Sequence, residues 1–185
     1  MRAFVGPSAL RLSVVDLASL IRDVPDFPEP GVIFKDITPV LAHSATFAEL
    51  IMAMAEPHQG AGVSKVVGIE ARGFTLAAPV AKELGAGFVP LRKPGKLPAA
   101  TITETYSLEY GTDALEMHVD AVEKGEKILI VDDVIATGGT AAAAVNLLRR
   151  VGADVVGVSV FIELGFLNGR SALDGVPFYA LIKYD

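Results

Sequence analysis

The segment VDDVIATGGT, residues 131–140, combines residue types that could bind a phosphate. Gly138 and Gly139 allow backbone angles and a close ligand approach that a Cβ atom would prevent. Backbone N–H groups around Thr137 and Thr140 would point to one place at the start of the following helix, where the helix dipole favours an anion. Because the threonine hydroxyls add further donors, the segment predicts a cradle for a monophosphate.

Two carboxylates, those of Asp132 and Asp133, come just before this cradle. Like charges repel, so they are better placed to accept hydrogen bonds from sugar hydroxyls of the same ligand than to meet its phosphate. The two features together indicate a ribose 5-phosphate site. The segment has neither the Gly-Lys-Ser/Thr of a Walker A loop nor the spaced glycines of a dinucleotide fold. The alternative interpretation is an ordinary strand-to-helix turn with solvated aspartates.

Further charged residues lie at predicted strand ends and in loops. Arg72 falls between a predicted strand and a predicted helix. Lys93 and Lys96 belong to the loop RKPGKLP, a basic arm suited to closing over a polyanion. Glu109 sits in YSLEYG, within a predicted pair of strands. The plainer alternatives are a surface ion pair for Arg72, a solvated loop for the lysines and a water-exposed hairpin tip for Glu109.

Alternating strands and helices must position these residues. KILIVD, residues 127–132, contains the uninterrupted apolar run ILIV, typical of a strand buried on both faces of a parallel sheet, and a helix is predicted over 140–151. Other strands are predicted at 65–70, 87–91, 154–162 and 178–182, an antiparallel pair within 101–119, and helices at 14–24, 44–56 and 74–84. Residues 26–36 are predicted to form a loop. This order indicates an α/β fold with a mainly parallel sheet and its site at the strand carboxyl ends.

Length and composition exclude several classes. The 185 residues predict one domain over residues 14–185, after an extension of residues 1–13 that is no convincing targeting segment. Acidic residues outnumber basic ones by 22 to 16, a net charge of −6 that argues against nucleic acid as a partner. Without cysteine there is no disulfide or thiol nucleophile, which suits the cytoplasm. No apolar run is long enough for a membrane span, so a soluble protein is expected.

The positions of the three histidines in the sequence do not predict a metal site. None lies at metal-ligand spacing from another ligand or beside a plausible serine nucleophile. They are His43, His58 and His118.

Five motifs occur in the order and spacing of one enzyme family. DFPEPGVIFKDITPVL, EARGF, LRKPGKLP, YSLEYG and VDDVIATGGT resemble the type I phosphoribosyltransferases, and among them the adenine phosphoribosyltransferases. The resemblance implies a twisted, mainly parallel sheet flanked by helices, with a small hood and a flexible loop. It also implies transfer of the 5-phosphoribosyl group from phosphoribosyl pyrophosphate (PRPP) to adenine, giving AMP and pyrophosphate, by a homodimer that uses Mg²⁺.

The resemblance assigns roles to residues that match the family motifs. Glu109 would take the proton that adenine loses as N9 attacks the ribose. The PRPP site would comprise Asp132, Asp133, Ala136, Thr137, Gly138, Gly139 and Thr140. The pyrophosphate site, whose first segment holds a non-proline cis peptide in the family, would comprise Glu70, Ala71, Arg72, Gly73, Lys93, Lys96 and Tyr110. The adenine site would comprise Ile33, Phe34, Lys35 and Val134. Mg²⁺ would be held mainly by substrate oxygens and water, with no ligand directly from the protein.

On the sequence alone, two alternatives to adenine phosphoribosyl transfer remain. The base could be an oxopurine such as hypoxanthine or xanthine. The fold also serves as a non-catalytic PRPP sensor in transcriptional regulators. The negative net charge, the lack of a recognisable DNA-binding segment before Val14 and the presence of Glu109 favour an enzyme.

Overall fold

The computed structural model describes residues 16–107 and 112–185. By their internal contacts the residues form two compact units, one up to Glu49 and the other from Leu50 to Asp185. Helix α2 (Ser44–Ala55) runs from the first unit into the second. The single domain over residues 14–185 stays a prediction.

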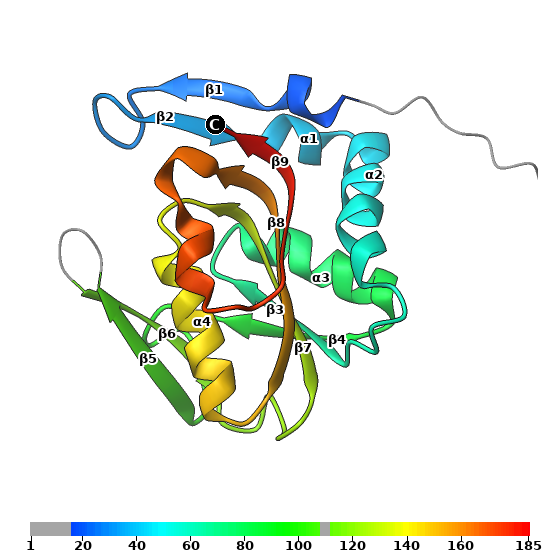
Figure 1. Ribbon diagram of the computed structural model, residues 1–185, viewed down its shortest axis with the longest axis vertical. Helices are drawn as coiled ribbons and strands as arrows, with labels where there is room; N and C mark the ends of the chain where they lie inside the picture. Colours follow the sequence, from blue (N-terminus) through cyan, green and yellow to red (C-terminus); the bar gives the residue numbers. More distant parts are fainter. Residues whose placement is uncertain (1–15, 108–111) are drawn as a thin grey trace, which may run out of the picture. The chain divides into compact units, whose positions relative to one another are not determined.

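A five-stranded parallel sheet forms the centre of the larger unit (Figure 1). The strands are β3 (Lys65–Ile69), β4 (Gly87–Leu91), β7 (Lys127–Ile135), β8 (Asp154–Leu164) and β9 (Phe178–Tyr184), in the order β4-β3-β7-β8-β9. Helix α3 (Gly73–Leu84) connects β3 to β4, and α4 (Gly139–Arg150) connects β7 to β8 in the opposite direction along the sheet. The order reverses between β3 and β7, which is where open α/β sheets bind ligands. The predicted α/β class is confirmed.

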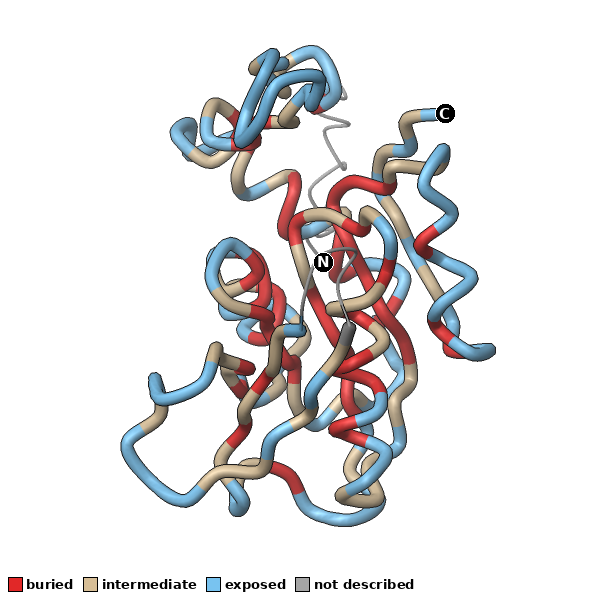
Figure 2. The backbone as a smooth tube through the Cα atoms, turned by 90° about the vertical axis from the view of Figure 1, so that its left-hand side faces the viewer, coloured by how far each residue is buried: buried red, intermediate tan, exposed pale blue. Residues whose placement is uncertain are grey.

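Strand β7 lies in the middle of this sheet because its sequence is apolar on both faces. Ile128, Leu129, Ile130 and Val131 are fully buried, and Figure 2 shows buried stretches in red running along the strands. Each such side chain contributes about 1.5–3 kcal/mol through burial. Pairing with β8 continues to Ile135, so the strand is longer than predicted. The two aspartates therefore lie within the sheet, and the alternative of a solvated turn is wrong.

An antiparallel hairpin and the helices complete the larger unit. The hairpin consists of β5 (Thr101–Ser107) and β6 (Thr112–His118), as predicted, and its Leu115 and Met117 join the core beside the buried face of α4. Arg150 of α4 pairs with Glu104 of β5 at 2.8 Å. Short 3-10 helices are η2 (Glu56–His58), η3 (Gly165–Leu167) and η4 (Gly169–Leu173).

The smaller unit corrects two predictions. The helix expected over 14–24 is instead the 3-10 helix η1 (Leu17–Leu20) followed by strand β1 (Arg22–Pro25). This strand pairs antiparallel with β2 (Ile33–Asp36), which lies within the predicted loop 26–36, and Arg22 forms an ion pair with Asp36. Pairing with a partner strand overrides the helical spacing of the apolar residues. Helix α1 (Thr38–Ala42) follows.

Every helix within the described residues is too short or too polar to span a lipid bilayer.

Candidate active site

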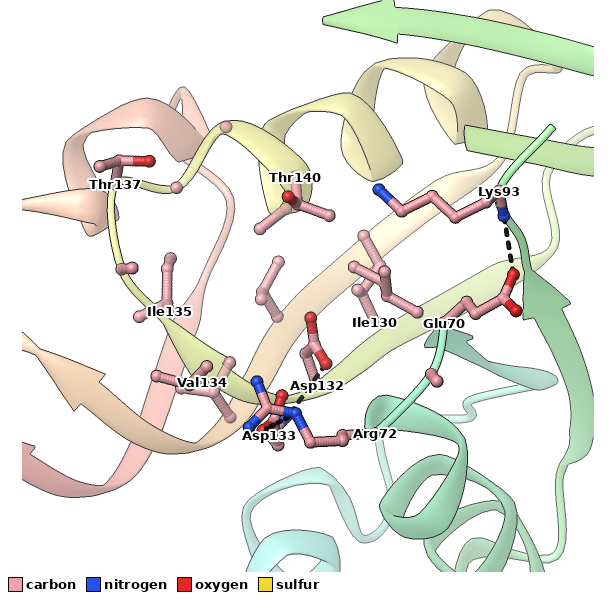
Figure 3. Close-up of a pocket in the computed structure, with 18 residues that line it drawn as sticks. Glu70, Arg72, Lys93, Ile130, Asp132, Asp133, Val134, Ile135, Thr137 and Thr140 are labelled. Atoms are coloured by element: carbon pink, nitrogen blue, oxygen red, sulfur yellow. Dashed lines mark hydrogen bonds and ion pairs between the residues drawn. The ribbon is translucent and has the colours of Figure 1, made fainter. Parts of the chain in front are cut away.

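An open pocket of about 240 Å³ lies where the sheet order reverses. Figure 3 shows its walls, formed by the segment after β3, by Lys93 after β4, and by the end of β7 with the start of α4. Most of the residues predicted for PRPP and pyrophosphate line it: Glu70, Ala71, Arg72, Lys93, Asp132, Asp133, Ala136, Thr137, Gly138, Gly139 and Thr140. Segments about 60 residues apart in sequence thus meet at one place.

The start of α4 presents backbone amides to this pocket. Gly138 is the N-cap, with φ of 85°, a conformation that favours glycine. It has no side chain that could hydrogen-bond the first-turn amides, so these stay available. Gly139, Thr140 and Ala141 all line the pocket. Open amides at a helix N-terminus favour an anion, and the monophosphate site expected from the sequence stays a prediction.

Asp132 and Asp133 lie close together, and Arg72 pairs with one of them. Asp133 is buried, and its Oδ2 pairs with Arg72 Nε at 3.0 Å, while Asp132 Oδ1 accepts a hydrogen bond from the Asp133 N–H at 2.9 Å. Burial raises the pKa of Asp132 well above its usual value, and the Asp133 charge raises it further. Burial also raises the pKa of Asp133, against the effect of Arg72. A ligand that donates hydroxyl hydrogen bonds would stabilise the ionised pair.

The close approach of Asp132 requires glycine at position 73. A Cβ atom on Gly73 would lie 2.7 Å from Asp132 Oδ1 and 3.1 Å from the Val131 carbonyl oxygen. Glycine therefore lets the first turn of α3 approach the carboxylates.

The segment after β3 has the expected cis peptide bond, between Glu70 and Ala71. The Glu70 carboxylate accepts hydrogen bonds from Arg92 Nη2 at 2.9 Å and from the Lys93 N–H at 2.8 Å. These bonds lower the pKa of Glu70. Glu70 thus fixes the start of the basic loop. A pyrophosphate role for its side chain stays a prediction.

Arg92, which sequence analysis did not single out, pairs with Glu70 beside the pocket. Its Nη1 also donates to the Lys96 carbonyl oxygen at 2.9 Å, so it connects Glu70 to the loop. A signal was available, because β3 and β4 are parallel neighbours with Ile69 opposite Leu91, which places the next residues, Glu70 and Arg92, side by side.

Lys93 connects the pocket to the hairpin. Its Nζ pairs with Asp113 of β6 and donates to the Tyr106 hydroxyl of β5 at 3.0 Å. Tyr106 in turn donates to Asp113 at 3.1 Å and accepts from Thr140 Oγ1 at 3.3 Å. Burial lowers the pKa of Lys93, but the bonds to Asp113 and Tyr106 outweigh this and raise it. Lys93 is thus a cation at the rim of the pocket.

The other predicted residues are not all brought together here. Among the described residues, Lys96 is exposed and is not part of the lining. Val134 lines the pocket. Glu109 and Tyr110 lie outside the described residues. Three predicted adenine contacts belong to the smaller unit, on β2: Ile33, Phe34 and Lys35.

Within that unit, the residues of β2 contact the neighbouring strand and loop. Phe34 packs edge-on against Phe27, with ring centroids 5.1 Å apart, and Lys35 Nζ pairs with Asp23 at 2.6 Å. Their role toward adenine stays a prediction.

Comparison with known proteins establishes the class. The sequence model of one protein family, the phosphoribosyl transferase domain, matches residues 37–172. This range includes the pocket and the elements that build it. The chain therefore belongs to the phosphoribosyltransferase family, with the type I fold.

Individual relatives narrow the class. The adenine phosphoribosyltransferase of Thermobifida fusca is 61% identical over 161 residues, 87% of this chain and 92% of the relative. The crystal structure of adenine phosphoribosyltransferase from Rhodothermus marinus is 54% identical with a TM-score of 0.88, over 91% of this chain and 96% of that one. The Saccharomyces cerevisiae enzyme, crystallised with an imino-altritol bisphosphate and adenine, is 39% identical with a TM-score of 0.85, over 89% of this chain and 96% of that one. The resemblance to the adenine phosphoribosyltransferases is confirmed.

The proximity of the two aspartates predicts that removing one charge stabilises the fold but weakens substrate binding. We expect Asp132→Asn to raise the free energy of unfolding at neutral pH by about 1 kcal/mol and to weaken PRPP binding. The folded-state pKa of Asp132 lies above its unfolded value. The wild type therefore loses stability as pH rises from the unfolded toward the folded pKa, and the asparagine variant, which has no charge there, does not. Urea unfolding from acid to neutral pH measures this difference.

Asp113→Asn provides the matched control of opposite sign. The hydrogen bond from Lys93 lowers the pKa of Asp113, so its charge stabilises the fold above the unfolded pKa, and its loss should destabilise the protein at neutral pH. If Asp132→Asn destabilised the protein as much as Asp113→Asn, the inference that burial and the Asp133 charge disfavour the ionised Asp132 would be wrong.

Proposed function

We propose that this protein transfers the 5-phosphoribosyl group from PRPP to adenine, forming AMP and pyrophosphate in purine salvage. One observation carries the proposal: the open start of α4, the aspartate pair and the cationic segment with Arg72 meet in a single pocket. These three parts suit the phosphate, the ribose hydroxyls and the pyrophosphate of PRPP. The names of the relatives, and the adenine in the yeast crystal, support adenine as the base.

Binding would orient PRPP across the sheet edge. Backbone amides of residues 137–140 would hold the 5-phosphate, and Asp132 and Asp133 would accept hydrogen bonds from the ribose hydroxyls. The amides near Ala71, with Arg72 and Lys93, would bind the pyrophosphate. Glu70 would act indirectly, since its carboxylate orients Arg92 and the Lys93 backbone.

The reaction exchanges one bond at the anomeric carbon for another. The bond from this carbon to the pyrophosphate oxygen breaks, and its electron pair leaves with the pyrophosphate. The N9 lone pair of adenine forms the new bond, while the ring proton passes to the Glu109 carboxylate. The ribose gains oxocarbenium character between these events, and a nearby carboxylate stabilises that charge. By family resemblance, Phe34, Val134 and backbone groups of Ile33 and Lys35 are assigned to adenine.

Mg²⁺, a cytoplasmic location and a homodimer complete the proposal by family resemblance. Within residues 16–107 and 112–185, no three His, Asp or Glu side chains cluster as a metal site. The cation would be held mainly by substrate oxygens and water. The two aspartates lie in the same pocket, where their carboxylates would accept hydrogen bonds from water bound to the cation. Bound there, Mg²⁺ would neutralise charge on the leaving pyrophosphate.

Product analysis tests the proposal. The purified protein is incubated with PRPP, Mg²⁺ and, separately, adenine, hypoxanthine, guanine or xanthine, and the nucleotides are identified by chromatography. We expect AMP from adenine and little product from the oxopurines. Product formed chiefly from an oxopurine would overturn the base assignment, and PRPP binding with no product from any base would identify a sensor.

A further inference from the structure

The phosphate loop, residues 136–138, rests on a second glycine segment from a different part of the chain. A Cβ atom on Gly169, the first residue of η4, would overlap the Ala136 carbonyl oxygen and lie 2.9 Å from Gly138 N. Conversely, a Cβ atom on Gly138 would overlap the Gly169 carbonyl oxygen and lie 2.9 Å from its carbonyl carbon. The two backbones are therefore in direct contact, and no flexible side chain lies between them to absorb a change.

Ion pairs hold η4 in this position at both ends. At its start, Arg170 Nη2 lies 2.8 Å from Glu163 Oε2 and Nε lies 3.2 Å from Oε1. Glu163 is near the end of β8 and its side chain is only 4% exposed, so the pair anchors η4 to the central sheet. The guanidinium also lies 4.8 Å from the ring centroid of Phe178.

At the other end of η4, the C-cap Asp174 pairs with Arg149 of α4 at 3.0 Å. Leu173 is buried in the core, and Figure 1 shows this orange segment alongside α4. The helix that starts at the phosphate loop and the segment behind that loop are thus tied together.

From this geometry we infer that Gly169 and Arg170 are positioning residues for the 5-phosphate of the substrate. Neither is among the described residues that line the pocket, so neither would contact the ligand. The loop binds through backbone amides, and the directions of these amides depend on what lies behind the loop. Groups that stabilise charge must be held rigidly in place, and misplacement by about 1 Å can cost about 10²-fold in rate. The inference rests on the proposed function and extends it to residues outside the pocket.

Gly169→Ala tests the inference directly. We expect the KM for PRPP to rise about tenfold or more, because the methyl group displaces the loop backbone, while the KM for adenine stays near the wild-type value. Calorimetry with two fragments separates the subsites: affinity for ribose 5-phosphate should fall by a similar factor, and affinity for pyrophosphate should not. Gly157→Ala is the matched control, since the added Cβ would meet its nearest neighbours at an ordinary 3.5 Å, and it should behave as the wild type.

Arg170→Lys is a milder second test. It tests the positioning role by itself if the Gly169→Ala variant does not fold. Lysine cannot reproduce both hydrogen bonds to Glu163, so affinity for ribose 5-phosphate should fall by about threefold to tenfold, with pyrophosphate affinity retained. Wild-type ribose 5-phosphate affinity in the variants, or an equal loss for both fragments, would overturn the inference. Failure of the wild type to form AMP would instead overturn the proposed function, and the fragment comparison would still test the positioning role.

Discussion

Replacing Glu109 by alanine is expected to lower kcat by about 10²–10⁴-fold, the usual contribution of a general acid–base group. Adenine must lose a ring proton as its nitrogen bonds to the anomeric carbon, and the carboxylate would accept that proton. The affinity for PRPP should change little, because the residues expected to bind its phosphate and ribose lie in other segments, which line the pocket, and the Glu109 side chain is not among those expected to bind the pyrophosphate. Steady-state kinetics with adenine, together with calorimetry with PRPP, measure both quantities.

Two further variants make this test specific. Glu109→Gln keeps the size of the side chain but cannot accept the proton as a carboxylate does, so it should lose nearly as much turnover as the alanine variant. Glu123→Ala removes an exposed glutamate outside the pocket lining and should keep wild-type activity. Unchanged turnover in Glu109→Ala would refute the catalytic role.

Replacing Gly139 by valine should have the largest effect on binding. Gly139 is the first residue of α4 and lines the pocket, so a branched side chain there would occupy space needed by the phosphate. Loss of about two charge-assisted hydrogen bonds corresponds to about 3–4 kcal/mol, or about 10²–10³-fold in Kd for PRPP. Calorimetry with PRPP measures the loss, and affinity for pyrophosphate alone should be retained.

Gly87→Val is the control for this substitution. Gly87 starts β4, and an added Cβ would meet chiefly the Lys65 side chain at 3.3 Å, which can move. This variant should bind PRPP as the wild type does. A Gly139→Val protein with wild-type PRPP affinity would show that the start of α4 does not bind the phosphate.

The central sheet and the phosphate loop could be predicted because their signals are local. An apolar run such as residues 128–131 is typical of a strand buried on both faces, and the small residues 136–139 favour a tight turn before α4. The helix over 74–84 and the hairpin within 101–119 were predicted correctly for similar reasons. The extension of β7 to Ile135 was not, since it depends on pairing with β8.

Features that depend on distant partners could not be predicted. The spacing of Val14, Leu17, Ala18 and Ile21 is helical, yet Arg22–Pro25 forms a strand because β2 pairs with it. The network of Lys93, Tyr106 and Asp113 joins three segments, and nothing local indicates it. The requirement for glycine at position 169 could not be predicted either, because a side chain there would collide with a loop about 30 residues earlier.

A crystal structure of the protein with PRPP and Mg²⁺, without a base, tests the central claim most directly. The account predicts the 5-phosphate within hydrogen-bonding distance of the amide nitrogens of residues 137–140, with the ribose hydroxyls on Asp132 and Asp133 and the pyrophosphate near Arg72. PRPP bound in the reverse orientation, with its pyrophosphate at the start of α4, or bound outside this pocket, would contradict it.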